Sequence, residues 1–202
     1  TMMLMCITVG VCAGKTEILH FIRQHYRCKI YLADEFARLI QQPGQVCHAK
    51  ITALLGKGIL KADGCIDRDR MAARIFVDNE LLKKVNAIVH PAVRQYLENA
   101  VRKARAEGNT ELFFIEAALL IENGYRDYVD EMWYIYAPIA VRKERLRQSR
   151  SYSDAKTEQI MQSKLTEERL RQNCDFVIDN GGTLAEAYEQ VRKRLEAYTW
   201  QE

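Results

Sequence analysis

The sequence has few of the features that mark secreted, membrane-spanning or metal-binding proteins. Its six cysteines form no Cys-x-x-Cys pair, and no histidine stands at ligand spacing from them, so a disulfide framework and a zinc site have little support. No apolar run approaches the roughly 20 residues that span a bilayer. The apolar start, residues 1–7, is too short for a signal peptide and lacks its basic region. We therefore expect a cytoplasmic protein with reduced thiols and no membrane partner.

The sequence also lacks a strong charge of either sign. The net charge is +3 over 202 residues, and hydrophobic and charged residues make up 48% and 28%, which is typical of a globular protein with one sizeable core and small appended modules. The basic residues cluster in one charged segment with few interleaved aromatics, so a nucleic-acid partner is not expected. There are no internal repeats, and the sequence does not indicate an oligomeric state.

Short apolar runs recur along the chain and predict five β-strands. The runs are Leu4–Val9, Lys29–Ala33, Leu112–Ile115, Met132–Ala137 and Phe176–Ile178. Each later run is followed by loop or polar helical sequence. The first run is apolar without interruption, as in a strand buried on both faces of a sheet. This alternation predicts an α/β fold with a five-stranded, mainly parallel sheet.

The segments between the predicted strands are uneven in length. The longest, between the second and third strands, carries several helical patterns punctuated by glycines, and we interpret it as a helical insertion that binds a substrate. The segment 140–173 is strongly charged and is interpreted as a lid. The last segment has a clean apolar stripe at helical spacing, which predicts a C-terminal helix.

A candidate phosphate-binding loop follows the first predicted strand. Gly14-Lys15-Thr16 stands between an apolar strand and an amphipathic helix, the context in which backbone N–H groups and a helix N-terminus cradle phosphates. In such loops the lysine reaches the β- and γ-phosphates and the hydroxyl binds Mg²⁺. The motif is imperfect, because Val9 stands where the first glycine is expected and Cys12 replaces another common glycine. An accidental Gly-Lys-Thr turn at a helix start is the alternative.

Over nearly its whole length the chain resembles the dephospho-CoA kinase family. That family opens Thr-Gly-Gly-Ile-Gly-Ser-Gly-Lys-Ser, which residues 8–16 match with substitutions. Its His-Pro-x-Val/Ile-Arg motif is intact at residues 90–94. Further matches follow in the same order: Leu32-Ala33-Asp34, Ala37-Arg38, Gln42-Pro43-Gly44, Gly64-Cys65-Ile66-Asp67-Arg68, Glu116-Ala117-Ala118-Leu119-Leu120-Ile121-Glu122 and Asp175-Phe176-Val177-Ile178-Asp179-Asn180. The ordered set is more specific than any one motif.

The resemblance implies transfer of the ATP γ-phosphoryl group to the ribose 3′-hydroxyl of dephospho-CoA, which gives CoA, with ATP and Mg²⁺ as cofactors. It implies a P-loop kinase core with a helical CoA-binding insertion and a lid. We assign 1–34, 110–140 and 174–202 to the nucleotide-binding core, 35–109 to the substrate module and 141–173 to the lid. The expected partner is the small-molecule substrate.

The resemblance assigns the phosphate loop to the nucleotide. Lys15 is expected to neutralise the β- and γ-phosphates, and Thr16 to hold Mg²⁺. Backbone N–H groups bind phosphate without needing a particular side chain, so these contacts can survive the substitutions in the loop. The predicted nucleotide-binding residues of the loop are Gly10, Val11, Cys12, Ala13, Gly14, Lys15 and Thr16.

Two carboxylates are candidate catalytic residues. Asp34 follows the second strand, at the edge where α/β folds bind ligands, and can accept the proton of the ribose hydroxyl. Its alternative role is a helix N-cap. Glu116 ends the third strand in place of the family's aspartate and can bind Mg²⁺ through water or contact the substrate. Its alternative is a solvated acid at a strand end.

The remaining candidates bind the acceptor or close over the phosphates. His90 and Arg94 are expected to face the CoA side, close together at the start of a helix that Pro91 begins. Packing or capping is the alternative for His90, and an exposed helix position for Arg38. The predicted acceptor-binding residues are Asp34, Arg38, His90, Arg94 and Glu122.

The lid segment holds five basic residues within nine positions. Charge runs are usually solvated helix faces, yet phosphoryl transfer gains from cations that close over the γ-phosphate. Arg145 is the predicted catalytic arginine and Arg150 a predicted nucleotide contact, with Arg147 as the alternative to Arg150.

Two other functions stay open. The first is a P-loop kinase that acts on another small acceptor. The second is a weakened relative that binds nucleotide or CoA without turnover, a reading that the departures at Val9, Cys12, Leu32 and Ala118 motivate.

Overall fold

The computed structural model describes residues 1–9, 13–117, 124–150 and 167–198. The chain divides into two compact units. One comprises Thr1–Tyr31 and Gly108–Glu202, and the other Leu32–Glu107. We call them the sheet unit and the helical unit. The units meet at residues 31/32 and 107/108, three and two residues from the limits 34/35 and 109/110 expected for the substrate module. The binding role of that module stays a prediction.

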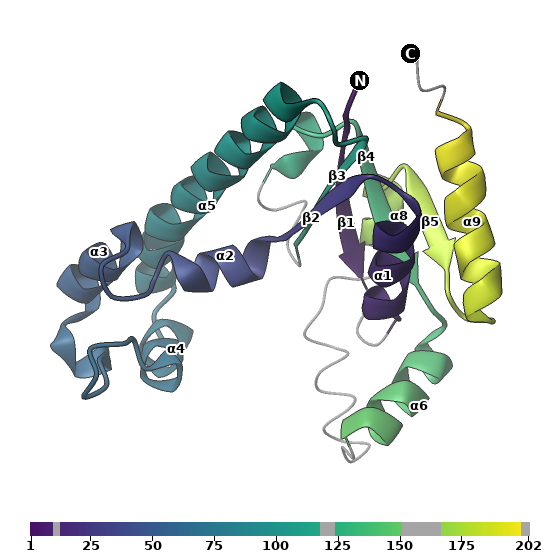
Figure 1. The fold of residues 1–202 in the computed structure, drawn as a ribbon. Helices are drawn as coiled ribbons and strands as arrows, with labels where there is room; N and C mark the ends of the chain where they lie inside the picture. The colour runs from purple at the N-terminus through teal and green to yellow at the C-terminus, as the bar shows by residue number, and fades with distance from the viewer. Residues whose placement is uncertain (10–12, 118–123, 151–166, 199–202) are drawn as a thin grey trace. The chain divides into compact units, whose positions relative to one another are not determined.

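Five strands form one sheet in the order β2-β3-β1-β4-β5 (Figure 1). β1 pairs in parallel with β3 and with β4, and β4 pairs in parallel with β5. The predicted α/β fold with a five-stranded, mainly parallel sheet is confirmed. The strands are β1 Met3–Val9, β2 Cys28–Leu32, β3 Leu112–Glu116, β4 Glu131–Tyr136 and β5 Phe176–Asp179.

The three central strands form the core of the sheet unit. Residues Leu4–Ile7 of β1 and Leu112–Ile115 of β3 are essentially inaccessible to solvent, as their unbroken apolar runs predict for strands covered on both faces. Trp133 of β4 is fully buried and makes edge contacts with Phe114 and Phe176, at ring separations of 5.2 and 5.0 Å. Aromatic packing therefore joins β3, β4 and β5.

Helices cover the sheet. α1 (Lys15–His25) and α9 (Leu184–Glu196) lie side by side, where Phe21 stacks on Tyr188 with ring centroids 4.3 Å apart. α9 begins with a capping box formed by Thr183 and Glu186, in which each residue satisfies a backbone N–H of the first turn. The other helices in the described part of this unit are η2 Tyr125–Asp127, α6 Ile139–Arg150 and α8 Glu167–Asn173.

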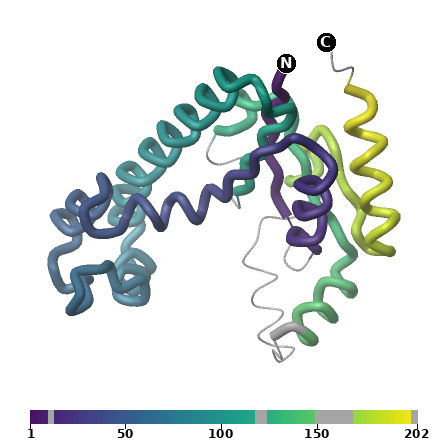
Figure 2. Tube along the Cα trace, in the orientation of Figure 1, coloured from purple at the N-terminus to yellow at the C-terminus, as the bar shows by residue number. Residues whose placement is uncertain are grey.

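The helical unit is built around one long helix, α5 (Asn79–Glu107) (Figure 2). Its buried stripe runs through Val85, Val89, Val93 and Leu97, at the spacing of one helix face. α2 packs on it through Phe36 and Tyr96, whose ring centroids are 4.7 Å apart. The other elements are α2 Ala33–Leu39, α3 Val46–Leu55, η1 Lys57–Ile59 and α4 Arg68–Phe76.

Pro91 lies inside α5 rather than at a helix start, so the prediction that it begins a helix is wrong. Proline has no N–H to bond the carbonyl four residues earlier, here that of Ala87. The helix nevertheless continues, because buried residues on both sides of the proline, Val89 and Val93, hold it against the rest of the unit. Packing outweighs the local helix-breaking tendency.

No helix in the described part of the chain is both long enough and apolar enough to cross a membrane. α5 has the length, but it carries charged residues along its exposed face.

Leu97 tests whether the stripe of α5 holds the helical unit together. Its side chain is fully buried, so we expect Leu97→Ala to lower the free energy of unfolding by about 3 kcal/mol through lost burial and a cavity. Gln95 is exposed on the same helix, and Gln95→Ala is the matched control with an expected change within about 0.5 kcal/mol. Urea unfolding followed by circular dichroism measures both. Equal destabilisation by the two variants would contradict the assigned core.

Candidate active site

The described end of the junction between β1 and α1, from Ala13 onward, fits the end of a phosphate-binding loop. Gly14 precedes the helix with φ 95°, in the left-handed region that glycine adopts without steric cost. No side chain caps the first turn of α1, so its backbone N–H groups are available to an anion. Thr16 lies in that turn and is exposed. The junction thus offers the donors and the hydroxyl that a nucleotide triphosphate requires.

Lys15 and Glu116 form an ion pair beside this junction. The distance between Lys15 Nζ and Glu116 Oε1 is 3.6 Å, and the Glu116 side chain is only 7% exposed. β1 and β3 bring the two residues together, since Glu116 is in register with Ile7 and β1 leads into the loop. Glu116 is therefore a buried carboxylate beside the loop lysine, and its alternative role as a solvated acid is wrong.

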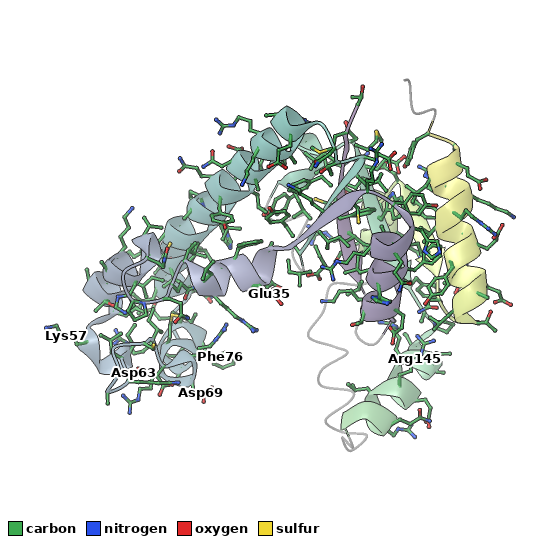
Figure 3. The ribbon with its side chains drawn as sticks, viewed as in Figure 1. Glu35, Lys57, Asp63, Asp69, Phe76 and Arg145 are labelled. Carbon is green, nitrogen blue, oxygen red and sulfur yellow. The ribbon has the colours of Figure 1, made fainter. Side chains whose placement is uncertain are left out.

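Asn180, which the sequence analysis did not single out, also contacts this site. Its side-chain Nδ2 donates to Ala13 O at 2.7 Å, and its own carbonyl accepts from Arg145 Nη2 at 2.9 Å. Figure 3 labels Arg145 on α6. A polar residue directly after a predicted strand is the signal that identifies such a position, because the carboxyl ends of parallel strands meet at the ligand-binding edge of the sheet.

Several predicted site residues lie outside the described residues. They are Gly10, Val11 and Cys12 in the loop and Glu122 after β3. Arg150 is the last residue of α6, and its side chain also lies outside the description. Arg147 of the same helix pairs with Glu144 at 3.4 Å. The roles of all these residues stay predictions.

Asp34 and Arg38 lie four residues apart on α2 and are both exposed, so they share one solvent-facing side of the helix. The N-cap of α2 is Leu32 and no side chain caps the helix. Asp34 is instead the second helical residue. The capping alternative is therefore wrong, and its carboxylate remains available for chemistry.

His90 and Arg94 also lie one turn apart, in the middle of α5. His90 is exposed and within the helix, so it is neither packed in a core nor a cap. Partial desolvation of the ring lowers the pKa of His90 below its usual value, so the imidazole is mostly neutral at pH 7. Arg94 Nε pairs with Glu98 at 3.1 Å.

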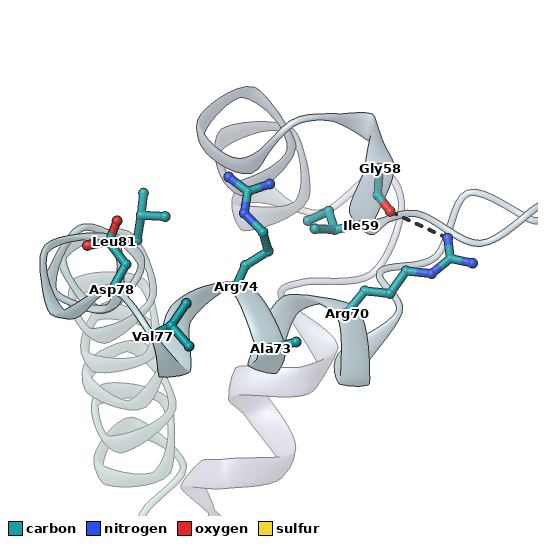
Figure 4. A pocket seen from close by; sticks show the side chains of 8 residues that line it. All are labelled: Gly58, Ile59, Arg70, Ala73, Arg74, Val77, Asp78 and Leu81. Carbon is teal, nitrogen blue, oxygen red and sulfur yellow. Dashed lines mark hydrogen bonds between the residues drawn. The ribbon is translucent and has the colours of Figure 1, made fainter.

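A pocket of about 560 Å³ lies within the helical unit (Figure 4). Arg70 and Arg74 rim it, and their guanidinium groups donate to the carbonyls of Leu60 and Leu55 at 3.2 and 2.7 Å. The predicted acceptor-binding residues are not among those that line it. The lining residues are Gly58, Ile59, Arg70, Ala73, Arg74, Val77, Asp78 and Leu81.

Among the described residues, no group of three or more His, Cys, Asp or Glu side chains could hold a metal ion. Mg²⁺ in kinase sites needs no such cage, because it keeps several waters and binds one or two protein oxygens together with the substrate phosphates. The exposed Thr16 hydroxyl and the Glu116 carboxylate at the loop fit that requirement.

A left-handed glycine followed by lysine and threonine, between a buried parallel strand and a helix, is the arrangement of a P-loop nucleotide-binding protein. Solved structures share the fold. A Thermus thermophilus protein superposes with a TM-score of 0.81 at 23% identity over 97% of both chains. Dephospho-CoA kinase from Campylobacter jejuni gives 0.70 at 23% identity, covering 96% of this chain and 95% of that one.

Sequence similarity then identifies the family. The family model described as "Dephospho-CoA kinase" matches residues 3–186. The dephospho-CoA kinase of Geobacter sulfurreducens is 33% identical over 94% of this chain and 93% of its own length. That of Geobacillus kaustophilus is 33% identical over 95% and 94%. The chain belongs to the dephospho-CoA kinase family, and the resemblance found in the sequence is confirmed.

Gly14 provides a test of the loop geometry. A Cβ added at Gly14 would lie 2.1 Å from Asn180 Nδ2 in addition to the strain of φ 95°. We expect Gly14→Ala to weaken ATP binding at least about tenfold, a free-energy change near 1.4 kcal/mol. Gly108 has φ 71° and open space around it, so Gly108→Ala tests the strain without the clash. Titration with a fluorescent ATP analogue compares the two. Unchanged affinity in folded Gly14→Ala would contradict this assignment.

Proposed function

We propose that the chain catalyses ATP-dependent phosphorylation of the ribose 3′-hydroxyl of dephospho-CoA, the last step of CoA biosynthesis. The observation that supports the donor half most directly is the Lys15–Glu116 pair at a left-handed Gly14. Family membership supports the acceptor half. In the reaction the hydroxyl oxygen bonds to the γ-phosphorus, the bond from that phosphorus to the β–γ bridging oxygen breaks, and ADP leaves.

The phosphate loop is proposed to bind the nucleotide. The N–H groups at the start of α1 receive the phosphates, and Lys15 neutralises the charge that develops as the phosphoryl group transfers. Because transfer has little covalent chemistry for the protein to perform, positioning and charge neutralisation provide most of the rate enhancement.

Mg²⁺ is the proposed metal cofactor. Thr16 would hold it, with Glu116 acting through water. When bound, the ion supplies charge neutralisation at the β- and γ-phosphates. Glu116 has a second effect that needs no metal, because its carboxylate orients the Lys15 ammonium at 3.6 Å.

Asp34 is the proposed base, and it accepts the proton of the 3′-hydroxyl as the new bond forms. Its exposed position in the first turn of α2 supports this role, since no cap engages it. Arg38 lies on the same side of α2 and is proposed to bind the acceptor, together with His90 and Arg94 of α5. Glu122 is proposed for the same substrate from the family match.

Arg145 is the proposed catalytic arginine of the lid segment. Its guanidinium contacts Asn180, whose side chain contacts the loop, and this proximity to the loop supports the proposed role. Arg150 is proposed as a nucleotide contact from the sequence. A cytoplasmic location is also proposed, and the oligomeric state is left to experiment.

An acceptor panel separates this function from the two alternatives. With dephospho-CoA, adenosine and several nucleoside monophosphates offered in turn, we expect ADP to form with dephospho-CoA and to require Mg²⁺. The readout is a coupled ADP assay with EDTA as the metal control. Preference for another acceptor would identify a different P-loop kinase. Tight binding of ATP and dephospho-CoA by calorimetry with no ADP formed would identify a relative without turnover.

Asp34 is tested by a neutral side chain of the same size. We expect Asp34→Asn to lower kcat by about 10²- to 10⁴-fold through loss of the base, with the ATP dissociation constant unchanged. Glu35 is the adjacent exposed acid on α2 (Figure 3). Glu35→Gln removes the same charge one position away, and we expect it to leave kcat within about twofold. Equal loss in both variants would overturn the assignment of the base to Asp34.

A further inference from the structure

Asn180 joins three segments of the sheet unit at one point. It directly follows β5, and its backbone N–H donates to Tyr136 O, at the end of β4, at 2.7 Å. Its side-chain Nδ2 donates to Ala13 O in the phosphate loop at 2.7 Å. Its carbonyl accepts from Arg145 Nη2 of α6 at 2.9 Å. The residue is 1% exposed, so these contacts are shielded from water.

The contact with Ala13 fixes the orientation of the Asn180 amide. A backbone carbonyl only accepts hydrogen bonds, so the NH₂ end must face the loop. The Oδ1 end is then buried, and it has no hydrogen-bond partner within the described structure. A buried acceptor without a partner is unfavourable for folding. The asparagine therefore does not serve stability alone. Its presence is better explained by a need for the Nδ2 donor that faces Ala13 O.

The Asn180 amide also fits closely against Gly14. A Cβ at Gly14 would meet Nδ2 at 2.1 Å, so the amide lies where only a glycine leaves room for it. The hydrogen bond to Ala13 O and the left-handed Gly14 are successive features of the same turn. Together they hold the carbonyl of Ala13 toward the protein interior, which leaves the N–H groups that follow it directed to an anion.

We propose that Asn180 is a positioning residue for the phosphate loop and that it couples the loop to Arg145 of α6. The proposal rests on the proposed role of the loop in binding ATP. Asn180 acts through Ala13 and Gly14 and does not itself touch the phosphates. A shift of the loop moves Asn180, and with it the Asn180 backbone carbonyl that accepts the hydrogen bond from Arg145.

Two substitutions and a matched control test the proposal. Asn180→Ala removes the donor, and Asn180→Asp keeps the shape but, when ionised, places an acceptor against Ala13 O. Gln190 is the control because it holds the neighbouring residue of the same strand end, with Nε2 donating to Asp179 O at 2.9 Å and Oε1 accepting from Asp179 N at 2.8 Å. Gln190 therefore anchors β5, and its hydrogen bonds within the described residues go to Asp179 and Glu186 rather than to the loop.

The readout is ATP affinity, measured with a fluorescent analogue and no acceptor present. We expect Asn180→Ala to weaken ATP binding about tenfold, the size of effect expected for one buried hydrogen bond. Dephospho-CoA affinity should be unchanged, and Gln190→Ala should bind ATP as the parent protein does. Thermal melting monitored by circular dichroism confirms that each variant is folded. Because no acceptor is used, the result does not depend on which hydroxyl the enzyme phosphorylates.

The pH dependence of Asn180→Asp separates positioning from a purely structural role. A protonated carboxyl group can donate to Ala13 O, whereas a carboxylate repels it, and burial raises the pKa of such an acid. ATP affinity of this variant should therefore fall as pH rises, in a step that the parent protein and Asn180→Ala lack. Unchanged ATP affinity in folded Asn180→Ala, equal losses in Asn180→Ala and Gln190→Ala, or equal weakening of both ligands would overturn the proposal.

Discussion

The burial of β1 between β3 and β4 is the constraint on which the sheet unit depends. Because β1 has neighbours on both sides and helices over the sheet, its residues Leu4–Ile7 are apolar and fully buried. Beyond the end of β1, the left-handed Gly14 is the N-cap of α1. The position of the phosphate loop thus follows from packing in the core.

Much of this arrangement could be predicted from local patterns. Short apolar runs identified all five strands, and the signal is strongest for the central strands β1, β3 and β4, which are buried on both faces. The Gly-Lys-Thr tripeptide in its strand–helix context identified the loop. These features are encoded within a few neighbouring residues, so one sequence is sufficient to reveal them.

Features that depend on distant contacts could not be predicted. The local preference of proline predicts a helix start at Pro91, but the buried face of α5 continues the helix through it. Asp34 has the residue type of a helix cap, yet α2 begins at Ala33, one residue before Asp34, and its N-cap is Leu32. Asn180 looks like an ordinary turn residue in the sequence, because its partner Ala13 lies 167 positions away in the chain.

With Lys15 in its proposed role at the phosphates, its pairing with Glu116 means that nucleotide binding would exchange one counterion of the lysine for another. A triphosphate that engages the lysine competes with a buried carboxylate only 3.6 Å away, so part of the attraction for phosphate is offset before contact is made. The same carboxylate is ready to take the ammonium back when ADP departs. An enzyme must release its product on every cycle. A lysine that already has a carboxylate partner binds ADP less tightly than an unpaired lysine would, and faster ADP release favours turnover.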